Sequence, residues 1–144
     1  MRKLALAVAL LVFTGCVKKE VQTMPSMGVG PSLVIEQFMR AANGKDLEGM
    51  ANLFGTKKGP VSKQWPKDEV EKRMFILAQE LRHNDFNITG EQMVPGRTDV
   101  ATRVMVQLVI ESQKVNVPFT LVRYGKQGWL IEDIKLEALT APKN

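Results

Sequence analysis

The stretch VATRVMVQLVI, Val100–Ile110, decides the fold. Its even-numbered positions are apolar apart from Thr102, so an extended chain would carry a continuous apolar stripe on one face. The same alternation continues over Val115–Leu121 and returns over Trp129–Leu136, and a shorter run begins at Phe86. This spacing of two predicts four antiparallel strands whose side chains form one strongly apolar face.

Two turns set the register that we expect for the last three strands. Ser112-Gln113 is the predicted turn of the first hairpin, and Gly125–Gly128 is the predicted turn of the second. The resulting register pairs apolar residues across both hairpins: Ile110 with Val115, Val106 with Phe119, Phe119 with Ile134, and Val117 with Leu136. A slip of one residue would place these stripes on opposite faces, so their agreement supports the predicted faces.

Upstream of the strands, apolar residues recur every three or four positions, which is typical of helices. They predict helices over Ser32–Ala42, Asp46–Phe54 and Pro66–Arg82, and the aspartate that opens the second helix is a suitable N-cap. The third helix carries Phe75 and Ile76 beside its main apolar stripe, so we expect it to be covered on two sides. Helices that cover one face of an antiparallel sheet give an α+β architecture.

The first sixteen residues have the composition of a lipoprotein signal. Two basic residues precede the ten apolar residues Leu4–Phe13. This run is too short to cross a bilayer, which needs about 20 helical residues. The sequence Phe13-Thr14-Gly15-Cys16 resembles a bacterial lipobox, and Cys16 is the single cysteine of the chain. We expect residues 1–15 to be a signal peptide and Cys16 to carry acyl chains such as palmitate; the alternative is an ordinary signal peptide followed by a buried thiol.

Residues 16–31 contain two prolines and two glycines close to the predicted first helix, so we expect a flexible tether. A tether of this length spans about 20 Å. Val17 follows the cysteine, and by resemblance to enterobacterial sorting this favours the outer membrane over the inner membrane. The expected location is therefore the bacterial cell envelope, with the protein held at the membrane by its lipid anchor.

The composition excludes several classes of site. One cysteine and one histidine cannot supply a disulfide framework or a Cys/His zinc site. Glycine-rich phosphate loops and the HExxH and GxSxG motifs do not occur in the sequence. Two of the basic residues behind the net charge of +5 belong to the predicted signal peptide, so the remaining positive charge is small. A charge this small argues against a nucleic-acid binder. We expect no metal, no cofactor and no nucleic-acid partner.

The spacing of apolar residues in the predicted helices and last strand carries a family resemblance. The matching residues are Val34, Phe38, Ala41, Asp46-Leu47, Met50 and Leu53-Phe54 at the start, and Trp129-Leu130-Ile131 with Ile134 at the end. This pattern resembles the nuclear transport factor 2-like superfamily. The resemblance implies a cone-shaped α+β domain over residues 32–140, with three helices packed on a curved four-stranded antiparallel sheet. The superfamily includes ketosteroid isomerases, SnoaL-type cyclases, limonene epoxide hydrolases and small bacterial lipoproteins of unknown function.

Three polar residues interrupt the apolar face that would line such a cone. In the predicted register Arg123 lies opposite Leu130 and beside Thr102, and Glu132 lies one diagonal away from Arg123. These residues are candidates for a ligand anchor at the mouth of the cone, because arginine binds carboxylate or phosphate groups well. The alternative is a structural ion pair at the rim of the sheet.

The predicted loop between the second and third helices is strongly basic. It contains Trp65 together with four lysines, namely Lys57, Lys58, Lys63 and Lys67. We interpret it as a candidate lip or lid that meets anionic lipid or glycan, so Trp65 is a candidate ligand-binding residue; the alternative is a solvated loop.

The opposite face of the predicted sheet also carries apolar residues. Tyr124 is expected to pair with Trp129, and Val122 with Ile131. An apolar cluster of this kind often marks an interface, so these four residues predict a homodimer or a contact with another envelope protein. Members of the resembled superfamily commonly dimerise through this face. The alternative is that a terminus or loop of the same chain covers it.

Two functions fit these patterns. The first is a lipid-anchored envelope protein with a non-enzymatic domain that binds a small hydrophobic or anionic ligand, or a protein partner. The second is a SnoaL-type or isomerase-type enzyme that acts on a small hydrophobic substrate through Glu132, Arg123 or His83. The predicted faces do not bring a carboxylate base opposite Tyr124. Cations are favoured at the C-terminal ends of helices, which accounts for His83 at the end of the predicted third helix without a catalytic role. The sequence therefore favours the first function.

Overall fold

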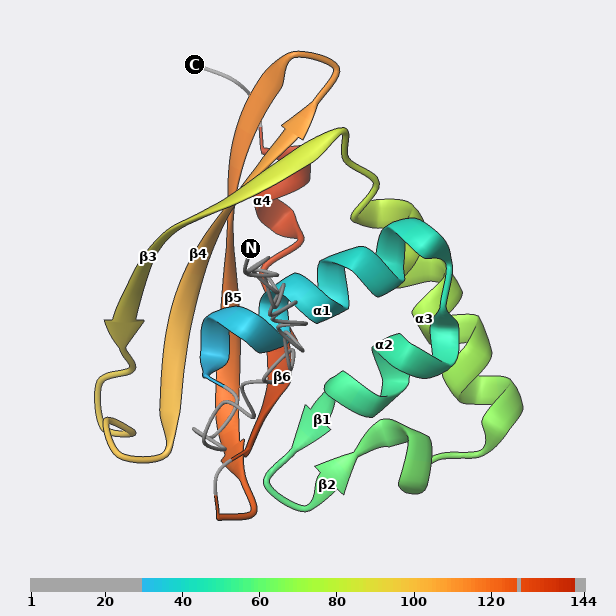
Figure 1. The fold of residues 1–144 in the computed structure, drawn as a ribbon, viewed down its shortest axis with the longest axis vertical. Helices are drawn as coiled ribbons and strands as arrows, with labels where there is room; N and C mark the ends of the chain where they lie inside the picture. Colours follow the sequence, from blue (N-terminus) through green and yellow to red (C-terminus); the bar gives the residue numbers. More distant parts are fainter. Residues whose placement is uncertain (1–29, 127, 142–144) are drawn as a thin grey trace, which may run out of the picture.

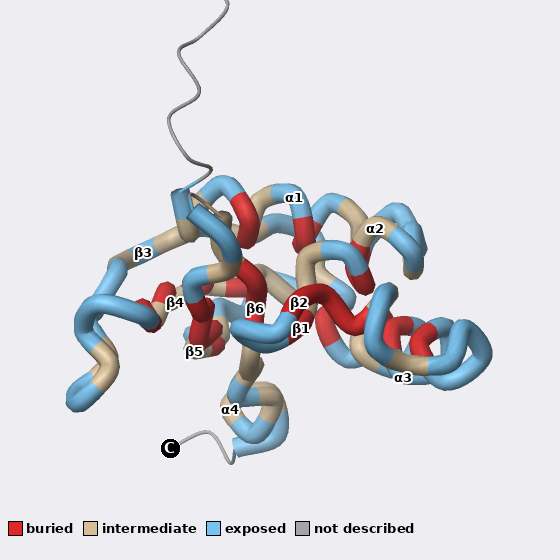
Figure 2. Tube along the Cα trace, turned by 90° about the horizontal axis from the view of Figure 1, so that it is seen from below, coloured by how far each residue is buried: buried red, intermediate tan, exposed pale blue. Residues whose placement is uncertain are grey.

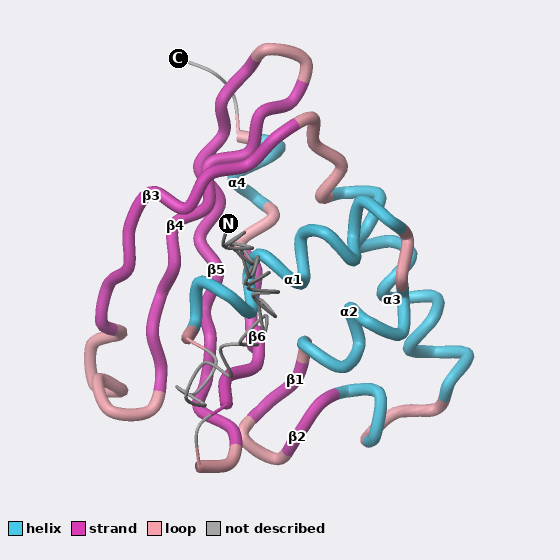
Figure 3. The backbone as a smooth tube through the Cα atoms, in the orientation of Figure 1, coloured by secondary structure: helices cyan, strands magenta, loops and turns pink. Residues whose placement is uncertain are grey.

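The computed structural model describes residues 30–126 and 128–141. The predicted signal peptide, Cys16 and most of the tether lie outside these residues. Four antiparallel strands form a sheet in the order β3–β4–β5–β6, with bounds Asp85–Met93, Ala101–Ile110, Gln113–Tyr124 and Gly128–Ile134. The helices α1, α2 and α3 span Pro31–Gly44, Leu47–Leu53 and Lys67–Glu80 and lie beside the sheet (Figures 1 and 3). The predicted α+β architecture is confirmed.

The helices begin where the sequence predicts. Asp46 Oδ1 accepts a hydrogen bond from the Gly49 N–H at 2.9 Å, so Asp46 is the N-cap of α2 as expected. Pro66 precedes the first residue of α3, where its fixed φ suits a helix start. A short fourth helix, α4, covers Glu137–Thr140. Among the described residues, no helix has both the length and the apolar character that a membrane crossing requires.

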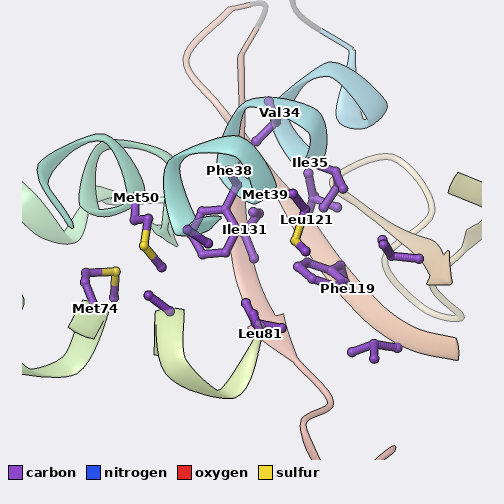
Figure 4. Packing of buried hydrophobic residues seen from close by; sticks show 14 of the residues in the cluster. Val34, Ile35, Phe38, Met39, Met50, Met74, Leu81, Phe119, Leu121 and Ile131 are labelled. Atoms are coloured by element: carbon purple, nitrogen blue, oxygen red, sulfur yellow. The ribbon is translucent and has the colours of Figure 1, made fainter. Parts of the chain in front are cut away.

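The core lies between α1–α3 and the apolar face of the sheet. In Figure 2 the buried stretches of helices and strands lie where these elements face one another. Figure 4 shows Phe38 and Met39 of α1 close to Phe119 and Leu121 of β5. The rings of Phe38 and Phe119 meet edge to face, with centroids 6.5 Å apart. The stripes of apolar residues at even positions of β4 and odd positions of β5 therefore supply the core, as predicted.

One feature of α3 contradicts the sequence prediction. Phe75 and Ile76 are 48% and 53% exposed, whereas Val70, Met74 and Ala78 are buried. The helix is covered on one side only. The helix lies at the edge of the domain, so nothing in the described chain packs on its second apolar flank (Figure 1).

The first large hairpin differs from the predicted register by two residues. Its turn is Glu111-Ser112, not Ser112-Gln113, and both turn residues have positive φ values of 47° and 69°. These are the signs that a two-residue type I′ turn requires. Val106 therefore faces Val117 rather than Phe119, and Ile110 faces Gln113 rather than Val115. A shift of two keeps every side chain on its predicted face, so the core is unaffected.

The second hairpin contains a β-bulge. Phe119 faces Ile134 as predicted, but the register shifts between Thr120 and Leu121, which leaves Glu132 of β6 unpaired. From there to the turn, every predicted pair is wrong. The observed pairs are Leu121 with Ile131, Val122 with Leu130, Arg123 with Trp129, and Tyr124 with Gly128. The predicted pairing of Val117 with Leu136 is also absent, because β6 ends at Ile134 and Leu136 precedes α4.

The predicted loop between α2 and α3 contains a small hairpin. Its strands are β1, Gly55–Thr56, and β2, Gly59–Pro60, and a 3-10 turn, η1, follows at Val61–Lys63. A bridge between Phe54 and Ile131 holds the start of this hairpin against β6. The side-chain amide of Gln64 donates to the carbonyl of Gly59 and closes the segment. The basic loop is therefore an ordered extension beside the sheet.

Candidate functional site

A surface cleft of about 540 Å³ lies at the end of the sheet where β4 begins and β5 ends. The β1–β2 turn, the β3–β4 loop and the β5–β6 turn all lie at this end, which is the lower end in Figure 1. The residues that line the cleft are Thr56, Lys57, Lys58, Gln64, Arg97, Val100, Val122, Arg123 and Glu132. The cleft thus brings together two of the three predicted polar residues of the sheet, Arg123 and Glu132, and two of the four lysines of the basic loop.

The β1–β2 turn positions Lys57 and Lys58. The Lys58 N–H donates to Thr56 Oγ1 at 3.2 Å, which tightens the turn. Gly59 has a φ of 135°, a conformation that a residue with a Cβ adopts only with strain. The open side of Gly59 lies against the ring of Tyr124, which a Cβ there would meet at 3.5 Å. The turn therefore rests on β5 in a defined place, with both lysine side chains exposed at its tip.

The β3–β4 loop positions Arg97. The Arg97 N–H donates to Val94 O at 2.9 Å, and Arg97 O accepts from the N–H groups of Val100 and Ala101. This tight turn directs the guanidinium to Glu132, with Nη1 to Oε2 at 2.7 Å and Nη2 to Oε1 at 3.1 Å. The hydrogen bond from Arg97 to Glu132, and the attraction between their charges, raise the pKa of Arg97 above its ordinary value.

The predicted pairing of Glu132 with Arg123 is therefore wrong. The bulge turns Trp129 to the face that carries Arg123, and the guanidinium lies over its ring with the Arg123 Cζ 4.8 Å from the ring centroid. Within the described residues, no carboxylate forms an ion pair with Arg123. Stacking on tryptophan orients a guanidinium while its N–H groups stay free to bind a ligand.

The electrostatic balance of the cleft favours an anion. Its lining holds four basic side chains and one carboxylate, and that carboxylate is already bound by Arg97. Three cations, Lys57, Lys58 and Arg123, are left to attract a ligand. Convergent charges of one sign raise the local concentration of the opposite ion and speed its association.

Other predicted site residues lie elsewhere. Thr102 is buried, and its hydroxyl is 3.0 Å from Glu91 Oε1 and 3.1 Å from Gln92 O, so it supports β3 rather than the cleft. Trp65 lies under the guanidinium of Arg73 and lines a separate groove of about 470 Å³ between α2 and α3. Of the two remaining lysines of the basic loop, Lys67 lines that groove and Lys63 lines neither site.

His83 also lies away from the cleft. It lines a third groove, at the C-terminal ends of α1 and α3. Its Nδ1 is 2.7 Å from Leu81 O, and its Nε2 is 3.1 Å from Asn43 Nδ2. Both ring nitrogens therefore have local partners that position the end of α3 against α1.

The residue that sequence analysis missed is Arg97. Pro95-Gly96 predicts the end of a strand and a turn, and Arg97 follows directly. A turn signal says where the chain reverses but does not say which distant residue the next side chain reaches. No pattern in the sequence pointed to its contact with Glu132.

We expect Glu132→Ala to lower the free energy of unfolding by about 1 kcal/mol or less. Arg97 and Glu132 are 40% and 26% exposed, so water screens their interaction. Urea unfolding of the variant and the wild-type chain measures the change. A loss of several kcal/mol would contradict this expectation and would mean that the pair behaves as a buried ion pair.

Comparisons with known proteins add no function. No family model matches the chain, and no curated protein matches it. Among solved structures, the chain is similar to an NTF2-like (nuclear transport factor 2-like) protein of unknown function from Cytophaga hutchinsonii. The two chains are 7% identical with a TM-score of 0.39, and the match covers 76% of this chain and 94% of the other. The helices on a four-stranded antiparallel sheet are the arrangement that the sequence resemblance implies.

Proposed function

We propose that this chain is a lipid-anchored protein of the bacterial cell envelope whose domain binds an anionic ligand in the cleft without transforming it. The observation that carries the proposal is the convergence of Lys57, Lys58 and Arg123 on one cleft, where the nearby carboxylate is already bound by Arg97. Phosphate and carboxylate groups are the ligands that such a cluster suits, because arginine and lysine bind both through charge-assisted hydrogen bonds.

The anchor in this proposal rests on the sequence around Cys16. A short apolar run and a single cysteine in a lipobox-like context support acylation there. One acyl chain binds a membrane marginally, and two or more hold a protein firmly. The residue after the cysteine, Val17, supports the outer membrane as the location.

Binding without catalysis is favoured by the separation of the titratable groups. An isomerase-type mechanism needs a free base and an acid at one site. In the described chain, Glu132 accepts two hydrogen bonds from Arg97, while His83 lines a different groove. The ring of Tyr124 packs on Gly59. These three groups do not converge on a common substrate position.

A homodimer or a protein partner stays a separate prediction. The four residues predicted for that interface do not form one exposed patch, because Val122 and Ile131 are buried and the bulge places Tyr124 and Trp129 on opposite faces. A single partner contact on one face of the sheet would therefore not include both aromatic rings.

Titration with inorganic phosphate, and separately with succinate, tests the proposed function. The full chain in mild detergent is titrated while its intrinsic fluorescence is followed, since Trp129 lies beside Arg123. We expect saturable binding of at least one of the two anions, and Arg123→Gln should weaken it by about tenfold or more.

Arg40→Gln is the matched control. Arg40 is an exposed arginine of α1 that lies outside the cleft, and its loss removes the same charge. The control should bind like the wild-type chain. Equal affinity of wild-type and Arg123→Gln chains, or no saturable binding of either anion, would overturn the proposal.

A further inference from the structure

Two exposed apolar side chains of the domain lie at the same end of the sheet as the basic cleft. Met93, at the end of β3, is 74% exposed, and Val100, which lines the cleft, is 48% exposed. Met93 comes directly before the β3–β4 loop, and Val100 is the last residue of that loop. Met93 pairs with Thr102, which lies two residues after Val100. Apolar side chains that are exposed together next to polar residues can mark a membrane interaction site.

Several basic side chains lie at the same end of the domain as this apolar pair. Lys57 and Lys58 lie at the tip of the β1–β2 turn, and Arg123 lies at the end of β5. Lys126, in the β5–β6 turn, adds a further exposed cation at the same end of the molecule (Figure 1). The β3–β4 loop carries one acid, Asp99, which does not line the cleft. Exposed apolar side chains and cations at one end of a domain are complementary to a membrane surface that bears phosphate.

We infer that this end of the domain docks on an anionic membrane surface. Lipid phosphates bind Lys57, Lys58 and Arg123, while Met93 and Val100 enter the headgroup layer. The inference rests on the proposed function and deepens it, because it names the headgroup phosphate of a bilayer as the anion.

The geometry favours a surface over a small dissolved ligand. The lysines lie on an exposed turn rather than on the walls of an enclosed cavity, so they can reach several phosphates at once. A small anion would use the cations and leave Met93 in water. A bilayer uses both kinds of side chain. Residue 30, the first described residue, comes fourteen positions after Cys16, and a chain of that length spans about 20 Å, so the proposed anchor would keep the domain close to the bilayer.

Hydrogen exchange on the full chain in nanodiscs tests the docking. The protein, as cells produce it, is placed in discs of phosphatidylcholine alone or of phosphatidylcholine mixed with phosphatidylglycerol. We expect the peptides that cover residues 56–58 and 93–100 to exchange in the anionic discs at about one fifth, or less, of their rate in the neutral discs. High salt should remove the protection, because it screens exposed charges beyond a few ångströms.

Charge reversal supplies the matched pair of variants. Lys57→Glu with Lys58→Glu should abolish the protection in anionic discs. Lys63→Glu with Lys72→Glu changes the charge by the same amount at exposed lysines outside the cleft, and it should leave the protection intact. Met93→Ser should weaken the protection while leaving phosphate binding in detergent unchanged.

The outcomes separate the docking from the proposed function. Equal protection in neutral and anionic discs, or protection that survives the Lys57 and Lys58 reversal, would overturn the docking. Absent protection together with phosphate binding in detergent would overturn the docking alone. Absent protection and absent anion binding would overturn both proposals.

Discussion

Phe119→Ala is expected to lower the free energy of unfolding by about 3–5 kcal/mol. Phe119 is fully buried in the centre of β5, facing Val104 on one neighbouring strand and Ile134 on the other. Its ring also meets that of Phe38 of α1 edge to face, so it joins the sheet to the helix layer. Truncation would leave a cavity that both layers line, and strands held by hydrogen bonds on both sides cannot collapse to fill it.

Phe75→Ala is the matched control for this prediction. It removes the same atoms from a ring of α3 that is half exposed, so the expected change is about 0.5 kcal/mol or less. Urea unfolding followed by circular dichroism measures both variants. A similar small loss for Phe119→Ala would mean that the helices do not pack on this face of the sheet.

The strands and helices were predictable because side-chain periodicity depends on local backbone geometry. Alternation in Val100–Ile110 reports a face of a strand whatever the partner strand is. The turn of the first hairpin was not predictable, because Glu111 and Ser112 are not the glycine or asparagine that usually mark positive φ. The resulting shift of two residues was harmless, since it preserved the faces.

The bulge in the second hairpin had larger consequences. One extra residue in β6 reverses the predicted face of the side chains between the turn and the bulge, and nothing in the sequence near Glu132 marks it. The alternation rule assumes an unbroken ladder, so it placed Trp129 on the wrong face. The same bulge leaves Glu132 unpaired in the ladder, and Arg97 binds it there.

The cleft itself depends on contacts between distant parts of the chain. The sequence singled out Arg123 and Glu132 as a ligand anchor and Lys57 and Lys58 as part of a basic loop, but it treated them as two features. They meet because Phe54 bridges to Ile131 and Gly59 packs on Tyr124. Local patterns carry no information about such pairings, which set where a loop lies against a sheet.

Cys16→Ser is expected to abolish acylation completely. The wild-type chain should start at Cys16 and carry the mass of its acyl chains, because the thiol is the acceptor in a lipobox-like sequence and no second cysteine can replace it. The variant should carry no acyl mass. Native mass spectrometry of protein extracted from its own membrane in mild detergent measures both, and an unmodified thiol in the wild-type chain would contradict the lipid anchor.

The same variant also separates the two membrane contacts that we propose. Acyl chains hold a protein through apolar burial worth about 0.8 kcal/mol per CH₂, which salt does not weaken. Docking through Lys57, Lys58 and Arg123 is electrostatic, so salt weakens it. In lipid binding assays at high salt, the wild-type chain should therefore stay bound through its acyl chains, while its cleft no longer contacts the lipid phosphates. Cys16→Ser should lose that salt-resistant attachment and keep a salt-sensitive one, which the Lys57→Glu with Lys58→Glu reversal then removes.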